Sequence, residues 1–209
     1  QRDANPFMRH EYLSALHASG AATPATGWTP RFLTLWRGDA LVAACPMYLK
    51  AHSYGEYVFD WAWANAYQQH GLRYYPKAVV AVPFTPVPGA RLMARTQADR
   101  EALARALTAW CAQEKVSSLH LLFANADDVA ASVSAGLMTR HTVQFHWNNS
   151  DKGYASFDDF LASLSQDKRK KIRQERRKVA DAGVTFRWSS GADISQPDWD
   201  FFYRCYERT

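Results

Sequence analysis

Apolar positions along the chain recur with two periods, one typical of helices and one typical of strands. A spacing of three and four residues predicts helices at 6–18, within 64–75, at 96–115 and 127–135, twice between 156 and 183, and at 197–209. Short alternating or continuous apolar runs predict strands at 32–37, 40–50, 57–63, 79–84, 118–124, 141–147 and 184–188. This mixed order predicts an α/β (α+β) fold with a mixed sheet.

Local cap and turn signals set several element ends. Thr96-x-x-Asp99 resembles a capping box with Asp in place of Glu or Gln, and Ser156 has the same spacing to Asp159. Gly136 and Gly183 follow helical patterns at the position where a left-handed residue ends a helix. The pair Gly38-Asp39 predicts a hairpin turn between the strands at 32–37 and 40–50.

A proline-rich segment follows the apolar run 78–82, with prolines at 83, 86 and 88 and a glycine at 89. Proline lacks the N–H that a sheet ladder needs, so we expect the strand edge to splay or end here. Unpaired carbonyls beside such a gap could accept bonds from an amide-bearing ligand arm, and the helix that opens at Thr96 favours phosphate. The alternative is an edge strand that prolines simply terminate.

Composition indicates a globular chain of 209 residues, 47% hydrophobic and 22% charged. No apolar run approaches the ~20 residues that a membrane-spanning helix needs, and the first residues show no signal peptide. Cys45, Cys111 and Cys205 are odd in number and widely spaced, which favours a reducing cytoplasm over disulfides or a zinc site. The seven histidines form no metal-binding spacing, so no metal is expected.

Positive charge is concentrated in one predicted helix. Residues 168–178 hold eight basic residues and one acid, a sum of +7, so the remainder of a chain with net charge +5 sums to −2. Such a run is stabilised when phosphates neutralise it, which indicates RNA, a nucleotide-linked precursor or an anionic membrane surface. The candidate anion-binding residues are Lys168, Arg169, Lys170, Lys171, Arg173, Arg176 and Arg177. The alternative is a solvated linker.

Three segments of the chain carry a resemblance to a known family. They are HSYGEYVFDWAWANAY (52–67), LRYYPKAVVAVPFTPVPGARL (72–92) and DKRKKIRQERRK (167–178). They resemble the FemAB-like group of predicted N-acyltransferases, which belongs to the GNAT superfamily and is described as peptidoglycan-biosynthesis-related. The resemblance implies a GNAT-like domain at 1–155, a basic helical linker at 156–183 and the beginning of a second, truncated GNAT-like domain at 184–209. The first residue is Gln and the helical pattern continues to the end, so we expect a fragment whose C-terminal domain is missing.

The resemblance also implies a reaction and its donor. An acyl or aminoacyl group would pass from acyl-CoA or an aminoacyl-tRNA to an amine acceptor, without a protein-bound intermediate. Backbone groups of the proline-rich segment would hold the donor arm, and Gly89 and Arg91 would meet its phosphates. The donor-binding residues implied in this way are Val82, Phe84, Thr85, Val87, Gly89 and Arg91.

Candidate catalytic residues follow from the predicted strand at 57–63 and its approach. The aromatic side chains on one face of this strand are expected to pack in the core. The opposite face, with Glu56 and Asp60, could line an acceptor pocket. A carboxylate is a suitable base for an attacking amine, but in a strand these two would lie ~13 Å apart. Either would therefore act alone, and Tyr75 or Tyr74 could protonate a leaving thiolate. The alternative is ordinary surface charge and aromatic packing.

Two further hypotheses remain at this stage. The first is a non-catalytic GNAT-like module that holds an anionic precursor, RNA or a lipid surface through the basic helix. It is motivated by the scarcity of glycine before the helix at Thr96. Gly89 is the single glycine there, and Arg91 to Arg95 lie between it and the helix. The second is a nucleic-acid-binding protein that uses the basic helix alone.

Overall fold

The computed structural model describes residues 5–209 and divides into two compact units. The N-terminal unit ends at Thr142, and the C-terminal unit spans Val143–Thr209. Each is described by itself below.

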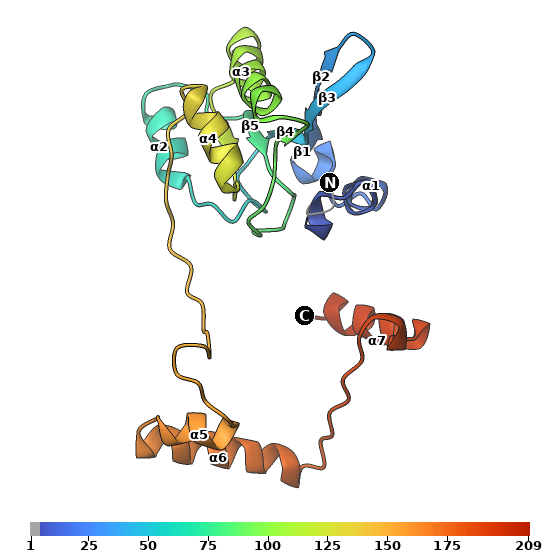
Figure 1. Ribbon diagram of the computed structural model, residues 1–209, viewed down its shortest axis with the longest axis vertical. Coiled ribbons are helices and arrows are strands. Elements are labelled where there is room, and N and C mark those ends of the chain that lie inside the picture. Colours follow the sequence, from blue (N-terminus) through green and yellow to red (C-terminus); the bar gives the residue numbers. More distant parts are fainter. Residues whose placement is uncertain (1–4) are drawn as a thin grey trace. The chain divides into compact units, whose positions relative to one another are not determined.

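The N-terminal unit combines helices with two small sheets (Figure 1). Its helices are η1 (Pro6–Met8), α1 (His10–Ala18), η2 (Pro24–Thr26), α2 (Trp61–Gln69), α3 (Gln97–Gln113) and α4 (Ala126–Ser134). Its strands are β1 (Trp28–Pro30), β2 (Leu33–Arg37), β3 (Ala40–Cys45), β4 (Met47–Lys50), β5 (Lys77–Val80), β6 (Met93–Ala94) and β7 (Leu119–Leu121). One sheet has the order β1-β4-β5-β7 and the other the order β2-β3-β6.

The strand predicted at 40–50 is in fact two strands in two different sheets, so that prediction is wrong. The break falls at Pro46, between β3 and β4, where the ring removes the backbone donor. β3 continues the β2 hairpin, whereas β4 pairs with β1 and β5. The proline therefore redirects the chain from one sheet into the other.

β5 lies between two partners and organises the four-stranded sheet. It runs antiparallel to β4 and parallel to β7, which lies at the end of the strand order. The main buried cluster includes Val80 from β5 together with Leu103 and Leu107 from α3. α3 and α4 pack side by side against this cluster (Figure 1).

Helices with local caps begin close to where the sequence predicts. The Thr96 side chain accepts a bond from the Asp99 amide at the start of α3, and Ser156 does the same for Asp159 in the C-terminal unit. Gly136 and Gly183 have positive φ values of 85° and 70° just after α4 and α6 (Gln166–Asp181). Both glycines therefore occupy the left-handed position expected at a helix end.

The strand predicted at 57–63 is wrong, because the chain forms a loop to Asp60 and then helix α2. Alanines alternate with the aromatic residues in α2, at 62, 64 and 66. Alanine has the highest helix propensity, and here the helical preference prevails over the period-two pattern. The strands predicted at 141–147 and 184–188 are also absent, and Phe145 and Trp188 are 95% and 96% exposed.

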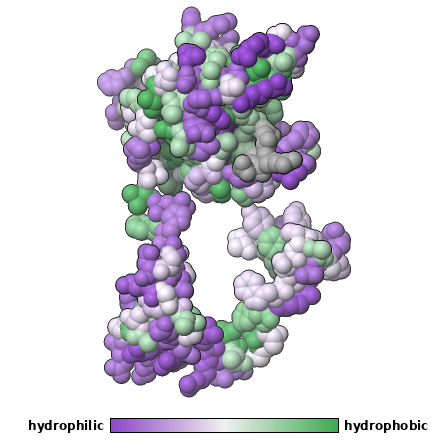
Figure 2. All heavy atoms as spheres, in the orientation of Figure 1, coloured by the Kyte–Doolittle hydropathy of each residue, from purple (hydrophilic) through white to green (hydrophobic). Residues whose placement is uncertain are grey.

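The C-terminal unit is helical in its regular parts. It contains α5 (Phe157–Ala162), α6, η3 (Gly191–Asp193) and α7 (Gln196–Glu207). Among the described residues of this unit, Leu161 is the one buried apolar side chain. Hydrophilic side chains dominate the surface around α6 (Figure 2). Among residues 5–209, no helix is both long and apolar enough to cross a membrane.

Candidate functional site

Two lysines lie side by side in the interior, where β4 and β5 pair. Lys50 ends β4, Lys77 begins β5, and the two are cross-strand partners. Both side chains are fully buried. Lysine is almost never fully buried without a partner, so the pair requires compensating charge nearby.

The loop between β4 and α2 supplies that charge. The Lys77 ammonium donates to Glu56 Oε2 at 2.8 Å, to Ser53 Oγ at 2.8 Å and to Asp60 Oδ2. Both carboxylates are themselves buried, and their second oxygens, Oε1 and Oδ1, have no hydrogen-bond partner in the described residues. A buried carboxylate oxygen without a partner is costly and marks a candidate functional position.

The expected separation of Glu56 and Asp60 is therefore wrong. The predicted strand would have held them ~13 Å apart, whereas the loop folds both carboxylates onto one ammonium. Asp60 lies at the start of α2 and the chain has turned by that point, with Tyr57 in a left-handed conformation at φ 59°. The structure thus makes a close carboxylate pair bridged by Lys77.

The two carboxylates have different electrostatic environments. Burial raises the pKa of Glu56, and the bond from Lys77 offsets only part of that effect. Burial also acts to raise the pKa of Asp60, but hydrogen bonds, first from Lys77 and also from Tyr74, outweigh it and leave the pKa lowered. Glu56 is therefore the carboxylate that takes a proton more readily.

Lys50 is held by different contacts. Its ammonium donates to the Tyr54 carbonyl at 3.0 Å and lies 3.6 Å from the centre of the Trp28 ring. Burial lowers the pKa of Lys50 to about 8, with Glu56 opposing and Lys77 adding to the shift. Lys50 thus titrates closer to neutrality than an ordinary lysine.

A chain of side-chain contacts joins this cluster to β7. The Tyr74 hydroxyl donates to Asp60 Oδ2 at 2.7 Å and lies 3.2 Å from His120 Nε2. The Ser118 hydroxyl lies 2.9 Å from the same nitrogen. The buried charges are therefore linked through one phenol to the imidazole of His120.

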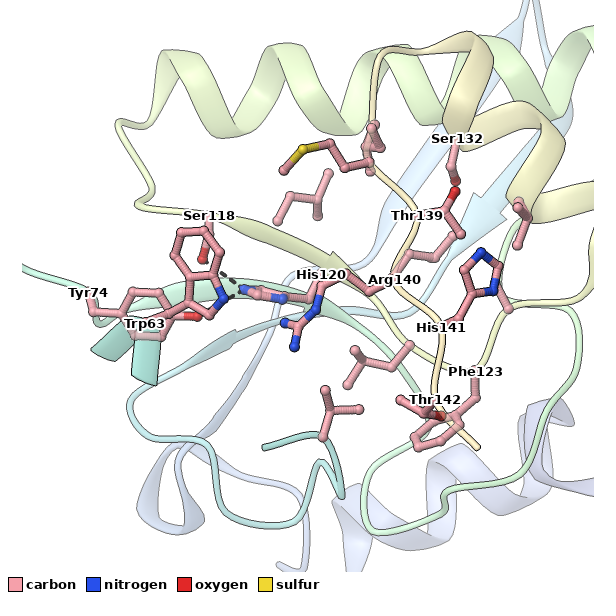
Figure 3. A pocket seen from close by; sticks show the side chains of 18 of the residues that line it. Trp63, Tyr74, Ser118, His120, Phe123, Ser132, Thr139, Arg140, His141 and Thr142 are labelled. Atoms are coloured by element: carbon pink, nitrogen blue, oxygen red, sulfur yellow. Dashed lines mark hydrogen bonds between the residues drawn. The ribbon is translucent and has the colours of Figure 1, made fainter. Parts of the chain in front are cut away.

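His120 lines a cavity of about 510 Å³ beside β7. The consecutive residues 118–124 form one wall, residues 137–142 form another, and Trp63, Tyr67 and Tyr74 close one end. Figure 3 shows His120 bonded to Ser118 and Tyr74, with the Arg140 side chain directed toward it. The cavity has the size of a small-molecule site and is walled by apolar groups around a few polar ones.

The contacts of His120 Nε2 assign the proton to that nitrogen. Asp60 only accepts, so the Tyr74 proton points to Asp60 and the Tyr74 oxygen is left to accept from Nε2, and the Ser118 oxygen at 2.9 Å can accept from the same N–H. The lone pair then resides on Nδ1. Burial first, and then the positive charges of Lys77 and Arg140, lower the pKa of His120 to about 4. His120 is therefore a neutral imidazole at physiological pH with one accepting nitrogen.

The ladder beside β5 ends just before the prolines, which is one of the two outcomes expected from the sequence. β5 is paired on both sides, and its ladder with β7 continues through the Leu122 amide to the Val80 carbonyl at 3.0 Å. The two chains separate after this point and meet again where Gly89 bridges Ala124. The prolines therefore lie in a loop at 83–88 between the end of the ladder and this bridge.

The six residues implied for donor binding make contacts with other parts of the N-terminal unit. Val82 is buried in an apolar cluster with Met8 and Leu13. The Phe84 amide donates to Gly55, Thr85 lies 3.1 Å from the Tyr12 hydroxyl, and the Val87 amide donates to Thr85. The Gly89 amide donates to the Phe123 carbonyl at 2.9 Å. These groups form internal bonds.

Arg91 is buried and does not face a ligand. Its guanidinium donates to the carbonyls of Leu122, Ala90 and Val87, and Asp128 accepts from its backbone amide. The phosphate contact expected of Arg91 stays a prediction without support from these contacts, because each of its three guanidinium nitrogens donates to a backbone carbonyl.

The remaining predicted residues lie in two places. The Tyr75 hydroxyl is 2.7 Å from Ser53 Oγ, at the edge of the Lys77 cluster. The predicted anion-binding residues Lys168, Arg169, Lys170, Lys171, Arg173, Arg176 and Arg177 all lie on α6, where only Arg169 is half-buried. Arg173 pairs with Asp158 at 3.8 Å, and Arg176 lies over the Phe157 ring.

No group of three or more metal-ligating side chains gathers within the described residues.

The sequence reasoning missed Lys50, Lys77 and His120. Lysine at a strand end usually faces water, and only the β4–β5 register shows that these two face inward. One signal was available: each lysine directly adjoins a continuous apolar run, Met47–Leu49 or Ala78–Val82. A lysine that extends a buried strand is a candidate buried charge.

The comparisons with known proteins identify a family. No curated protein and no solved structure matches the chain. The FemAB-like family, described as peptidoglycan biosynthesis/recognition, matches residues 1–209. Because that match spans the whole sequence, this chain belongs to the FemAB-like family of peptidoglycan biosynthesis/recognition.

Proposed function

We propose that the chain carries the acceptor site of an N-acyltransferase that joins an aminoacyl or acyl group to an amine of a cell-wall precursor. The observation that supports it best is His120, a neutral imidazole with a free accepting nitrogen in the cavity beside β7. The donor would be an aminoacyl-tRNA or an acyl-CoA. The family's role in peptidoglycan biosynthesis supports the acceptor class.

The proposed reaction needs one proton to leave the amine. The amine nitrogen forms a bond to the donor carbonyl, the carbonyl's bond to the tRNA oxygen or CoA sulfur breaks, and the proton ends on that leaving atom. An imidazole with a pKa of about 4 cannot deprotonate a free ammonium well. It is suited to a nitrogen that becomes acidic as the new C–N bond forms.

The basic helix supports a polyanionic partner. α6 places Lys168, Lys170 and Arg177 in solvent without an ion-pair partner in the described residues. The phosphate backbone of a charged tRNA is one such partner, and a nucleotide-linked precursor or an anionic membrane surface is another.

A transfer assay tests the proposal. The protein that contains this chain is incubated with labelled aminoacyl-tRNA or acyl-CoA and with an amine-bearing muropeptide. We expect transfer from one donor class and a loss of ~100-fold or more in H120A. The matched control is H70A, because His70 is exposed at the end of α2, away from the cavity lining. Transfer that is equal in H120A and H70A contradicts the proposed role of His120.

A second candidate is precursor recognition without transfer. The buried Arg91 favours it, because all three of its guanidinium nitrogens donate to backbone carbonyls. Recognition alone would give saturable muropeptide binding with no transfer from either donor. Binding that weakens when the cavity wall is altered, for example in M138W, would locate it beside β7.

A further inference from the structure

We propose that Tyr74 and the buried Lys77–Glu56–Asp60 cluster form a proton relay that stores the proton His120 takes from a ligand in the cavity. This inference rests on the proposed function for its substrate, but its geometry is independent of the donor. Asp60, Lys77 and Glu56 lie outside the cavity lining, and Tyr74 stands between them and the cavity, whose wall it helps to form.

The contacts are continuous from the cavity to the buried charges. His120 Nε2 lies 3.2 Å from the Tyr74 hydroxyl, which donates to Asp60 Oδ2 at 2.7 Å. Asp60 accepts from Lys77, which also donates to Glu56 Oε2 at 2.8 Å. Every bond in this chain joins groups that carry or accept a proton.

Proton transfer along this chain needs no movement of heavy atoms. When a proton arrives on His120 Nδ1, the Nε2 proton passes to the Tyr74 oxygen, and the Tyr74 proton passes to Asp60 Oδ2. His120 is then neutral again in its other tautomer. Lys77 passes one proton to Glu56 Oε2 and receives the proton on Asp60 Oδ2, so the added proton is stored on Glu56, the carboxylate that takes a proton more readily. The reverse movement returns the proton to the leaving oxygen or sulfur, so the cycle consumes no net proton.

The charge of the cluster depends on Lys50. Lys77 contributes +1 and Glu56 and Asp60 contribute −2, and the buried Lys50 brings the four groups to neutrality below its pKa of about 8. Above that pH Lys50 loses its charge, and one added proton then makes the remaining three groups neutral, which lowers the cost of burial.

The surrounding charged groups set the pH range of the relay. Lys50 from β4 faces Glu56, and Tyr75 borders the cluster through Ser53. Arg140, from the segment after α4, faces His120. The titratable and charged groups that face the relay are Lys50, Glu56, Asp60, Tyr74, Tyr75, Lys77, His120 and Arg140.

Y74F tests the relay because it removes the hydroxyl between His120 and Asp60 and keeps the ring. The matched control is Y48F, since Tyr48 is also buried and its hydroxyl lies 3.1 Å from His17, outside the relay. We expect kcat in Y74F to fall ~10- to 100-fold with KM unchanged, and to recover as imidazole is added. Wild type and Y48F should not respond to imidazole. A Y74F enzyme that matches Y48F in both respects overturns the relay.

A measurement that needs no activity separates this inference from the proposed function. The ¹⁵N spectrum of the His120 ring should show the Nε2–H tautomer in the wild type and a mixture of tautomers in Y74F. If wild type transfers no group, the proposed function fails, and the ring spectrum still decides the relay. An Nδ1–H tautomer in the wild type at neutral pH would overturn it.

Discussion

At the scale of single residues, Lys77 is the group on which the buried site depends. Its ammonium is the shared partner of Glu56 and Asp60. Lys77→Met leaves two buried carboxylates without a cation, and we expect it to lower the free energy of unfolding at pH 7 by ~3–5 kcal/mol. Urea denaturation measures this change.

The loss should become smaller at low pH, where both carboxyls are protonated in K77M. Lys115→Met serves as the control, because Lys115 is exposed just after α3 and an exposed substitution usually changes stability by less than ~0.5 kcal/mol. Equal effects of K77M and K115M would contradict the assignment of Lys77 as the central cation.

Lys50 gives the residue-scale prediction for pH. Its pKa is about 8 in the folded chain and 10.5 in the reference state, so between these values the unfolded chain binds more protons than the folded chain. Unfolding free energy therefore rises with pH across this window through Lys50, and below about pH 8 the buried charge lowers stability. We expect the difference in unfolding free energy, wild type minus Lys50→Met, to increase from pH 7 to pH 10. Urea unfolding at both pH values measures it. A difference that is constant or falls would contradict the shift.

The sequence predicted part of this site at the residue scale. Glu56 and Asp60 stood out as polar positions among aromatic residues, and Tyr75 or Tyr74 was named as a proton donor, but the sequence did not predict that these side chains meet. Lys77 and His120 could not be found in that way. Their contacts depend on the pairing of β5 with β4 and β7, which joins positions far apart in the chain.

At the scale of elements, local signals predicted the helix starts and the β2–β3 hairpin and failed for several other strands. α3 and α5 start where Thr96 and Ser156 cap them, because a cap needs only groups three residues apart. The strand predicted at 40–50 failed because Pro46 separates β3 and β4 into different sheets, and the strand predicted at 57–63 failed because helix propensity prevails from Trp61 onward. The sheet order therefore had to come from the structure.

α6 gives the element-scale prediction. We expect the chain to bind tRNA with an affinity that falls steeply as salt rises, and Lys170→Gln to lower the slope of log affinity against log salt by about 1. The control is Lys152→Gln, an exposed lysine outside the helix, which should leave the slope unchanged. Filter binding at several salt concentrations measures both. Equal slopes in wild type, K170Q and K152Q would exclude Lys170 from the phosphate contacts.

At the scale of the whole molecule, packing is unevenly divided between the two units. All four buried clusters are built from residues of the N-terminal unit, whereas the C-terminal unit exposes aromatic side chains such as Phe186, Trp188 and Tyr206. Exposed aromatic surface of this extent favours a further packing partner. The predicted domain limits at 155 and 183 remain predictions.

The last prediction follows from this uneven division. Because the sheets, the Lys77 cluster and the cavity all lie before Val143, the fragment 1–142 should unfold cooperatively on its own. Its free energy of unfolding should lie within about 1 kcal/mol of the value for the cooperative transition of the whole chain. A difference of this size is near the uncertainty of urea extrapolation. The fragment 143–209 should show helical circular dichroism without a cooperative transition, because α5, α6 and α7 together bury little apolar surface. A fragment 1–142 that is more than ~3 kcal/mol less stable than the whole chain would mean that the two units stabilise each other.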